Sequence, residues 1–157
     1  MKSINLGLIG FGNVGSGVVK ILNDKKAFLA AKTGLDISIR RICDKDITSK
    51  RNVSVDRKLL SRDPKDILND PQIDIVVELM GGVSPAREFI KEALKKGKNI
   101  VTANKALLAE HGQEGLDLLL AIHHLDDQGQ VHREAEDLGG VQAAGFAEAH
   151  WSAQHRR

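Results

Sequence analysis

Three glycines near the N-terminus have the spacing of a phosphate-binding turn. They lie in the segment Gly10-Phe11-Gly12-Asn13-Val14-Gly15, a G-x-G-x-x-G pattern between an apolar run and a helical pattern. In this setting the first glycine makes a tight turn, the second admits a pyrophosphate close to the main chain, and the third lets helix and strand pack closely. The free N–H groups and the dipole of a helix N-terminus favour an anion there. The alternative interpretation is a glycine-rich turn without a ligand.

A charged pair after the second apolar run bears on which dinucleotide such a turn would bind. Asp44 lies 29 residues after Gly15, and an acidic residue in this region accepts hydrogen bonds from the ribose of NAD. Lys45, within a basic stretch between residues 40 and 51, would instead accommodate the 2′-phosphate of NADP. The sequence leaves this choice open. It also leaves open an ordinary turn aspartate beside a solvated basic surface.

Lys105 is a candidate for proton transfer. It stands after a short strand pattern and in the first turn of the helical pattern that follows. A cation at this end of a helix opposes the helix dipole at a cost of about 0.3–1 kcal/mol, so another interaction must favour it. Ligands of open α/β sheets bind outside the carboxyl ends of the strands, where Lys105 would face the reactive end of the coenzyme. A catalytic role in proton transfer is therefore predicted, with a surface lysine as the alternative.

The elements that would hold these residues alternate between strand and helix. A polar stretch at residues 45–63 predicts a loop with a short helical turn. Apolar or alternating runs predict strands at residues 4–9, 36–43, 73–79 and 99–102. This order predicts an α/β fold, a Rossmann-type doubly wound parallel sheet, with residues 1–115 as its domain.

Helical spacing predicts one long helix after the glycine pattern. Its apolar face begins at Val14, includes Val19 and continues through Phe28, and Gly34 ends it.

Two further helices are predicted after residues 73–79. Ser84 is the expected N-cap of the first, with Pro85 in its first helical position and Gly97 at its end. The second begins near Asn104.

Composition bounds the class of protein. A chain of 157 residues with 41% hydrophobic content can bury one core, and it contains no apolar run near the roughly 20 residues of a membrane span. We therefore expect a soluble, cytoplasmic protein. Its single cysteine, Cys43, excludes an internal disulfide and a multi-cysteine zinc site, and its apolar setting predicts a buried thiol.

Charge is unevenly distributed along the chain. Residues 1–105 carry 20 basic and 12 acidic residues, a net charge of +8, whereas residues 106–157 carry 3 basic and 9 acidic residues, a net charge of −6. The basic residues of the first part are spread over helices and loops without interleaved aromatic residues. This distribution favours the phosphates of a small ligand over a nucleic acid.

Three segments together resemble homoserine dehydrogenase: GFGNVG at residues 10–15, DPQIDIVVELMGG at 70–82 and VTANKALLAEHG at 101–112. The resemblance covers about residues 4–114. It implies an oxidoreductase of threonine and methionine biosynthesis that interconverts aspartate semialdehyde and homoserine with NADP or NAD. It also implies a homodimer with a small-molecule substrate, without nucleic acid or membrane.

The resemblance also implies which residues line the coenzyme. Besides the glycine segment, Asp44 and Lys45, these are Gly81, Gly82, Thr102, Asn104 and Lys105. In the family, the lysine at the position of Lys105 assists proton handling, together with a second lysine and carboxylates of a following substrate domain. That domain is not found in these 157 residues, so we expect coenzyme binding without useful turnover.

Residues 116–157 form a tail that diverges from the family, in which a further helix and a strand at about residues 130–135 are predicted. The family spacing around its structural sodium is kept only in part, at Glu134, Gly139 and Val141, whereas Asp137 and Gln142 depart from it. The change of composition suggests a reading-frame disturbance or an interrupted gene. The histidines of the tail have no zinc-like spacing.

Two other functions stay open from the residues. One is a stand-alone NAD(P)-binding or regulatory module without catalysis. The other, a different Rossmann dehydrogenase, is disfavoured by the Thr102-Ala103-Asn104-Lys105 segment.

Overall fold

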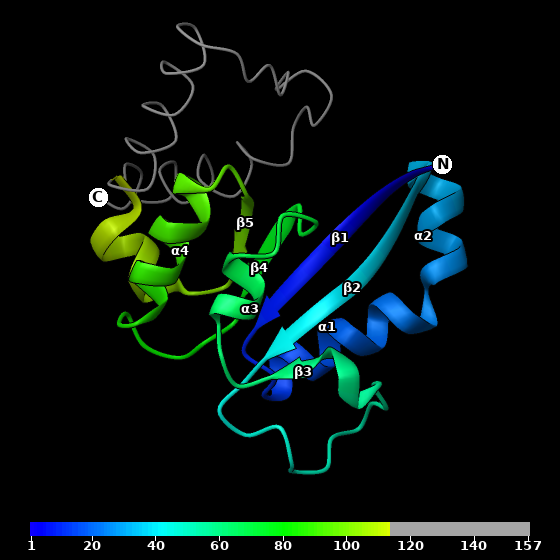
Figure 1. The fold of residues 1–157 in the computed structure, drawn as a ribbon, viewed down its shortest axis with the longest axis horizontal. Helices are drawn as coiled ribbons and strands as arrows, with labels where there is room; N and C mark the ends of the chain where they lie inside the picture. The colour runs from blue at the N-terminus through cyan, green and yellow to red at the C-terminus, as the bar shows by residue number, and fades with distance from the viewer. Residues whose placement is uncertain (114–157) are drawn as a thin grey trace, which may run out of the picture.

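Five parallel strands form one sheet in the computed structural model of the chain, which describes residues 1–113 (Figure 1). Their order across the sheet is β3-β2-β1-β4-β5. The strands are β1 (Lys2–Ile9), β2 (Leu35–Cys43), β3 (Leu60–Ser61), β4 (Ile75–Glu78) and β5 (Asn99–Thr102). This order confirms the predicted α/β fold, because the chain winds outward from β1 to β3 and then returns to the other side of β1.

The strands end level with one another. Ile9 pairs with Cys43 on one side and with Glu78 on the other, and Glu78 pairs with Thr102. Since all strands are parallel, the loops that leave these residues share one edge of the sheet. This edge is where open α/β sheets bind their ligands.

Helices cover both faces of the sheet (Figure 1). They are α1 (Asn13–Asp24), α2 (Lys26–Thr33), the 3₁₀ turn η1 (Arg57–Leu59), α3 (Lys65–Leu68) and α4 (Ala86–Lys95), followed by a helical segment at residues 105–113. In the part of the chain that the structure describes, no helix is both long enough and apolar enough to cross a membrane.

Alternate residues of the strands supply two apolar layers, as expected of a sheet covered on both faces. Leu8 and Ile42 pack with Val19 of α1, whereas their neighbours Ile9 and Cys43 pack with residues of α3 and α4. The α1 layer extends to Phe11 of the glycine turn, so the core is continuous with the candidate site.

The long first helix predicted from the sequence is wrong in two respects. The chain forms two helices, because Lys25 leaves helical geometry with φ −109° and ψ 11°. Val14 and Phe28 are 60% and 61% exposed, and Gly15, not Val14, faces the strands. Gly34 does end the second helix, with φ 72°.

Ser84 is not the N-cap of α4. The N–H groups of Glu88 and Phe89 both donate to the carbonyl of Pro85, at 3.1 and 3.2 Å, so Pro85 holds the cap position and the helix begins at Ala86. Gly97, with φ 70°, follows the helix as predicted.

Candidate functional site

The glycine turn has the geometry that a bound pyrophosphate needs. Gly12 is the N-cap of α1 without a side-chain cap, and a Cβ built on it meets no atom within 4 Å. The first helical bond is donated by the N–H of Ser16 to the Gly12 carbonyl at 2.9 Å, so the preceding N–H groups of the first turn are left without intrahelical partners. An anion can therefore approach the main chain here.

The other two glycines are required by close contacts. Gly10 has φ 103°, and a Cβ on it would lie 2.7 Å from the carbonyl oxygen of Leu79. A Cβ on Gly15 would lie 2.1 Å from the carbonyl oxygen of Gly10. Gly15 thus lets α1 close onto the turn, while Gly10 also lets the turn approach the loop after β4.

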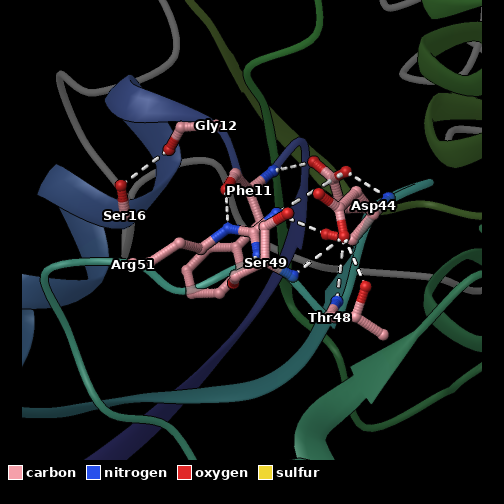
Figure 2. Close-up of polar contacts among 8 residues, drawn as sticks. Phe11, Gly12, Ser16, Asp44, Thr48, Ser49 and Arg51 are labelled. Atoms are coloured by element: carbon pink, nitrogen blue, oxygen red, sulfur yellow. Dashed lines mark hydrogen bonds and ion pairs between the residues drawn. The ribbon is translucent and has the colours of Figure 1, made fainter.

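Asp44 connects the glycine turn to the loop that follows β2 (Figure 2). Its Oδ2 accepts a hydrogen bond from the Phe11 N–H at 2.5 Å, and its Oδ1 accepts one from the Asp46 N–H at 2.8 Å. Asp44 therefore makes one local turn contact and one contact with the glycine turn 33 residues away. A carboxylate has about four acceptor sites, so two remain for the hydroxyls of a ribose, and that role stays a prediction.

Arg51 clamps the same two loops (Figure 2). Its Nε donates to the Phe11 carbonyl at 2.5 Å, its Nη1 donates to the Ser49 carbonyl at 2.7 Å, and its Nη2 donates to the Asp46 carbonyl. The guanidinium carbon also lies 4.6 Å from the centre of the Phe11 ring. Sequence reasoning placed Arg51 only in a basic stretch, because nothing in the local pattern shows a contact with a residue 40 positions away.

The basic stretch contains arginines that make hydrogen bonds and lysines for which residues 1–113 supply no partner. Arg40 donates to Asp70 at 2.7 Å and Arg41 donates to the Lys58 carbonyl at 2.7 Å, while Arg51 is held as described. Lys45 and Lys50 are exposed. Of the five cations in this stretch, these two lysines are the ones left to meet a 2′-phosphate.

Asp46 stabilises the loop in its ionised form. Hydrogen bonds from Ser49 and Thr48 hold the pKa of its carboxyl far below its usual range. Below about pH 3.9, the usual pKa of this carboxyl in an unfolded chain, the unfolded chain binds a proton that the folded chain does not. The contribution of Asp46 to the free energy of unfolding is therefore lost as pH falls from about 4. We expect Asp46→Asn to reduce the loss of unfolding free energy between pH 7 and pH 3, measured by urea denaturation. Asp24→Asn, at an exposed ion pair, is the control, and equal acid sensitivity in parent and Asp46→Asn would contradict the assignment.

The loops after β4 and β5 are joined by hydrogen bonds on the other side of the glycine turn. Asn104 Nδ2 donates to the Gly82 carbonyl at 2.6 Å, and Asn104 Oδ1 caps the following helix by accepting from the Leu107 N–H at 3.1 Å. The helix predicted near Asn104 is therefore confirmed. Gly82 has φ 83°, and Gly81 is exposed with open space around it.

Lys105 is the first helical residue of this segment and is exposed. Within residues 1–113 no hydrogen bond or ion pair engages its ammonium group, so it is available to a ligand at the shared edge of the sheet. Its catalytic role stays a prediction.

The predicted coenzyme-lining residues differ in what they can offer. Phe11 is 2% exposed, so its ring belongs to the core and only its main chain reaches the edge. Val14, Gly12 and Asn13 are exposed at the start of α1. The side chains of Thr102 and Asn104 donate hydrogen bonds within the protein, to Glu78 and to the Gly82 carbonyl. These two residues therefore shape the site by fixing its loops.

Cys43, the last residue of β2, is predicted to be unreactive in the native protein. Burial and then the nearby Asp44 raise the pKa of its thiol to about 11. A free thiol has a pKa of about 8.5, so Cys43 lowers the free energy of unfolding only as pH rises above that value. We expect the native thiol to react with a disulfide reagent at pH 8 roughly a hundredfold more slowly than the urea-unfolded chain. Equal rates would show that Cys43 is accessible.

No metal site occurs in the described part of the chain. Residues 1–113 contain no group of three or more His, Cys, Asp or Glu side chains able to hold an ion. Glu134, Gly139 and Val141 lie outside the described residues, as do the strand predicted at about 130–135 and the histidines of the tail.

Comparisons with known proteins find homoserine dehydrogenases, both by sequence and by fold. The homoserine dehydrogenase of Bacillus subtilis (strain 168) is 36% identical over 141 residues, covering 90% of this chain and 31% of that protein. A crystal structure of S. aureus homoserine dehydrogenase has a TM-score of 0.72 and 40% identity, covering 77% of this chain and 30% of that chain. A hyperthermophilic archaeal homoserine dehydrogenase in complex with NADPH, 23% identical with a TM-score of 0.60, shares the fold. The chain spans about a third of the length of the first two relatives.

A family model described as "Homoserine dehydrogenase, NAD binding domain" matches residues 10–125. The match begins at the first glycine of the turn and runs past the predicted domain boundary at residue 115, which itself stays a prediction. Because the match covers most of the chain, the protein belongs to the homoserine dehydrogenase family and carries its NAD-binding domain.

Proposed function

We propose that this chain is the coenzyme-binding part of a homoserine dehydrogenase, which interconverts aspartate semialdehyde and homoserine with NADH or NADPH. The observation that carries the proposal is the open N-terminus of α1 at Gly12, at the edge where β1, β2, β4 and β5 end level. The NADPH complex of the archaeal relative supports a nicotinamide coenzyme.

Different residues along this edge of the sheet bind different parts of the coenzyme. The first turn of α1 binds the pyrophosphate through main-chain N–H groups, and Asp44 orients the ribose of the adenosine half. Gly81, Gly82 and Lys105, exposed after the ends of β4 and β5, would hold the other half of the coenzyme. A bound nicotinamide supplies or accepts the hydride. The Lys105 ammonium holds the proton at the substrate oxygen.

The finer parts of the proposal follow from the family resemblance. They are a role in threonine and methionine biosynthesis, a cytoplasmic location, a homodimer and a structural sodium ion. Coenzyme choice depends on Lys45 and Lys50, because the arginines of the same stretch are engaged by the protein itself.

Fluorescence titration with NADPH and NADH tests the proposal. We expect saturable binding of at least one of them. The same chain is then assayed for homoserine oxidation: turnover above background supports an enzyme in itself, whereas binding alone supports a module that needs further chain. Absence of saturable binding for both coenzymes would refute the proposed function.

A further inference from the structure

Glu78 is a buried acid at the centre of the candidate site. It is the last residue of β4 and is 0% exposed, the only buried Asp or Glu among residues 1–113. Burying a carboxyl group is costly unless its oxygens receive hydrogen bonds. The fold therefore has to compensate for Glu78, and the partners that it uses indicate what the residue does.

Each oxygen of the Glu78 carboxyl group accepts a hydrogen bond from a different part of the candidate site. Oε1 accepts a hydrogen bond from the Met80 N–H at 2.6 Å, in the loop after β4. Oε2 accepts one from the Thr102 hydroxyl at 2.5 Å, at the end of β5. One carboxyl group thus connects the two loops on the side of the sheet away from Asp44.

These contacts close into a ring. The Thr102 hydroxyl, which donates to Glu78, accepts from the Asn104 N–H at 3.0 Å. Asn104 Nδ2 returns to the loop after β4 by donating to the Gly82 carbonyl at 2.6 Å. The ring therefore holds the loop after β4 at a fixed distance from the start of the helix that carries Lys105.

From this ring we propose that Glu78 is a positioning residue for the nicotinamide half of the coenzyme. It acts through Thr102 and Asn104, which fix the Gly82 loop and Lys105 relative to each other. The inference rests on the proposed function, because it assumes that a dinucleotide lies along this edge. The adenosine half, held near Asp44 and Arg51, does not depend on the ring.

A carboxylate suits this position better than an amide. The Thr102 hydroxyl accepts from the Asn104 N–H and uses its own proton to donate to Glu78. The Met80 N–H donates to the other oxygen of Glu78, so the side chain at position 78 has to supply two acceptors. Glutamine has the same shape but offers one acceptor and two donors. Glu78→Gln therefore leaves one of the two loops without its hydrogen bond while the side-chain volume is preserved.

The test compares each reduced coenzyme with the analogue that lacks nicotinamide: NADH with ADP-ribose, and NADPH with 2′-phospho-ADP-ribose. Calorimetry on the 157-residue chain measures the affinity of the parent, Glu78→Gln, Thr102→Val and Thr102→Ser. We expect the first two variants to bind the reduced coenzyme roughly tenfold more weakly, the effect of one lost hydrogen bond to a charged group. Affinity for the analogue should stay within about twofold. Thr102→Ser keeps the hydroxyl and should match the parent.

Amide hydrogen exchange provides a readout without coenzyme. Thr102→Val removes the acceptor of the Asn104 N–H, so that amide should exchange faster. In Glu78→Gln, the Met80 or the Asn104 amide should exchange faster, according to which loop loses its hydrogen bond, whereas the Leu79 amide, bonded to the Ile9 carbonyl at 2.8 Å, should be unchanged in both variants.

The outcomes separate the inference from the proposed function. A parent chain that binds neither coenzyme nor analogue would refute the proposed function, and the inference with it. If the parent binds but the variants lose affinity for coenzyme and analogue equally, or for neither, the positioning role of Glu78 is overturned while the proposed function stands. Unchanged exchange at Met80 and Asn104 would overturn the ring itself.

Discussion

Gly15→Ala is expected to destabilise the fold by about 3 kcal/mol, at the upper end of the range for overpacked sites. The new Cβ would lie 2.1 Å from the Gly10 carbonyl oxygen. The backbone fixes the position of a Cβ and the oxygen belongs to the backbone, so no side-chain rotation can relieve the clash. Gly10 cannot withdraw freely, because its N–H donates to the Cys43 carbonyl at 2.8 Å. Urea denaturation measures the loss of unfolding free energy.

Gly17→Ala is the matched control for this prediction. Gly17 lies in the same helix, and a Cβ on it meets no atom within 4 Å. The substitution should stabilise the protein by roughly 0.5–1 kcal/mol, because alanine restricts the unfolded chain more than glycine does. Similar effects at the two positions would show that α1 does not close tightly onto the glycine turn.

Gly12→Val is expected to leave the fold intact and to abolish useful coenzyme binding. A Cβ at this position points into open space, and the φ of −74° suits any residue, so the cost to the fold is limited to about 1 kcal/mol for a poorer N-cap. The added isopropyl group, however, occupies the space through which a pyrophosphate reaches the N–H groups of α1. We expect affinity for NADPH or NADH to fall by about a hundredfold or more, equivalent to about 2.7 kcal/mol.

Two variants control for nonspecific effects of this substitution. Gly17→Val adds the same group to the same helix, again into open space, and should bind coenzyme like the parent. Lys105→Ala should spare affinity far more than Gly12→Val, since Lys105 is assigned to proton transfer rather than to phosphate binding. Normal coenzyme affinity in Gly12→Val, with an unchanged melting temperature, would place the coenzyme elsewhere.

The main strands and the glycine turn could be predicted from sequence because their signals are local. The strand predicted at 99–102 has the observed bounds, since Gly97 ends the preceding helical pattern and the next begins near Asn104. The spacing of Gly10, Gly12 and Gly15 likewise indicates three different steric requirements, and the close contacts of Gly10 and Gly15 are now explicit.

Other elements were missed because they depend on tertiary contacts. β3 has only two residues and exists by pairing with the end of β2, and α3 is a single turn, too short to show a period. The break at Lys25 was hidden because Phe28 looks like a continuation of the apolar face although it is exposed.

Contacts within the site were also missed where they depend on residues far apart in the sequence. Asp44 and Lys105 were found by type and place in the chain, but the roles of Arg51 and Glu78 depend on partners 40 and 24 positions away. Such partners become visible only when the strands are set in register. A cation in a basic stretch, or an acid at the end of an apolar strand, does not reveal from its neighbours that it joins two loops.

The most direct test of the account follows the main-chain amides of the protein by NMR while NADPH or NADH is added. Binding of a pyrophosphate at the start of α1 predicts that the amide signals of Asn13, Val14 and Gly15 shift most, with the signals of the Gly81–Gly82 loop following. Saturation with the largest shifts on the outer surface of α4, or no shift with either coenzyme, would contradict it.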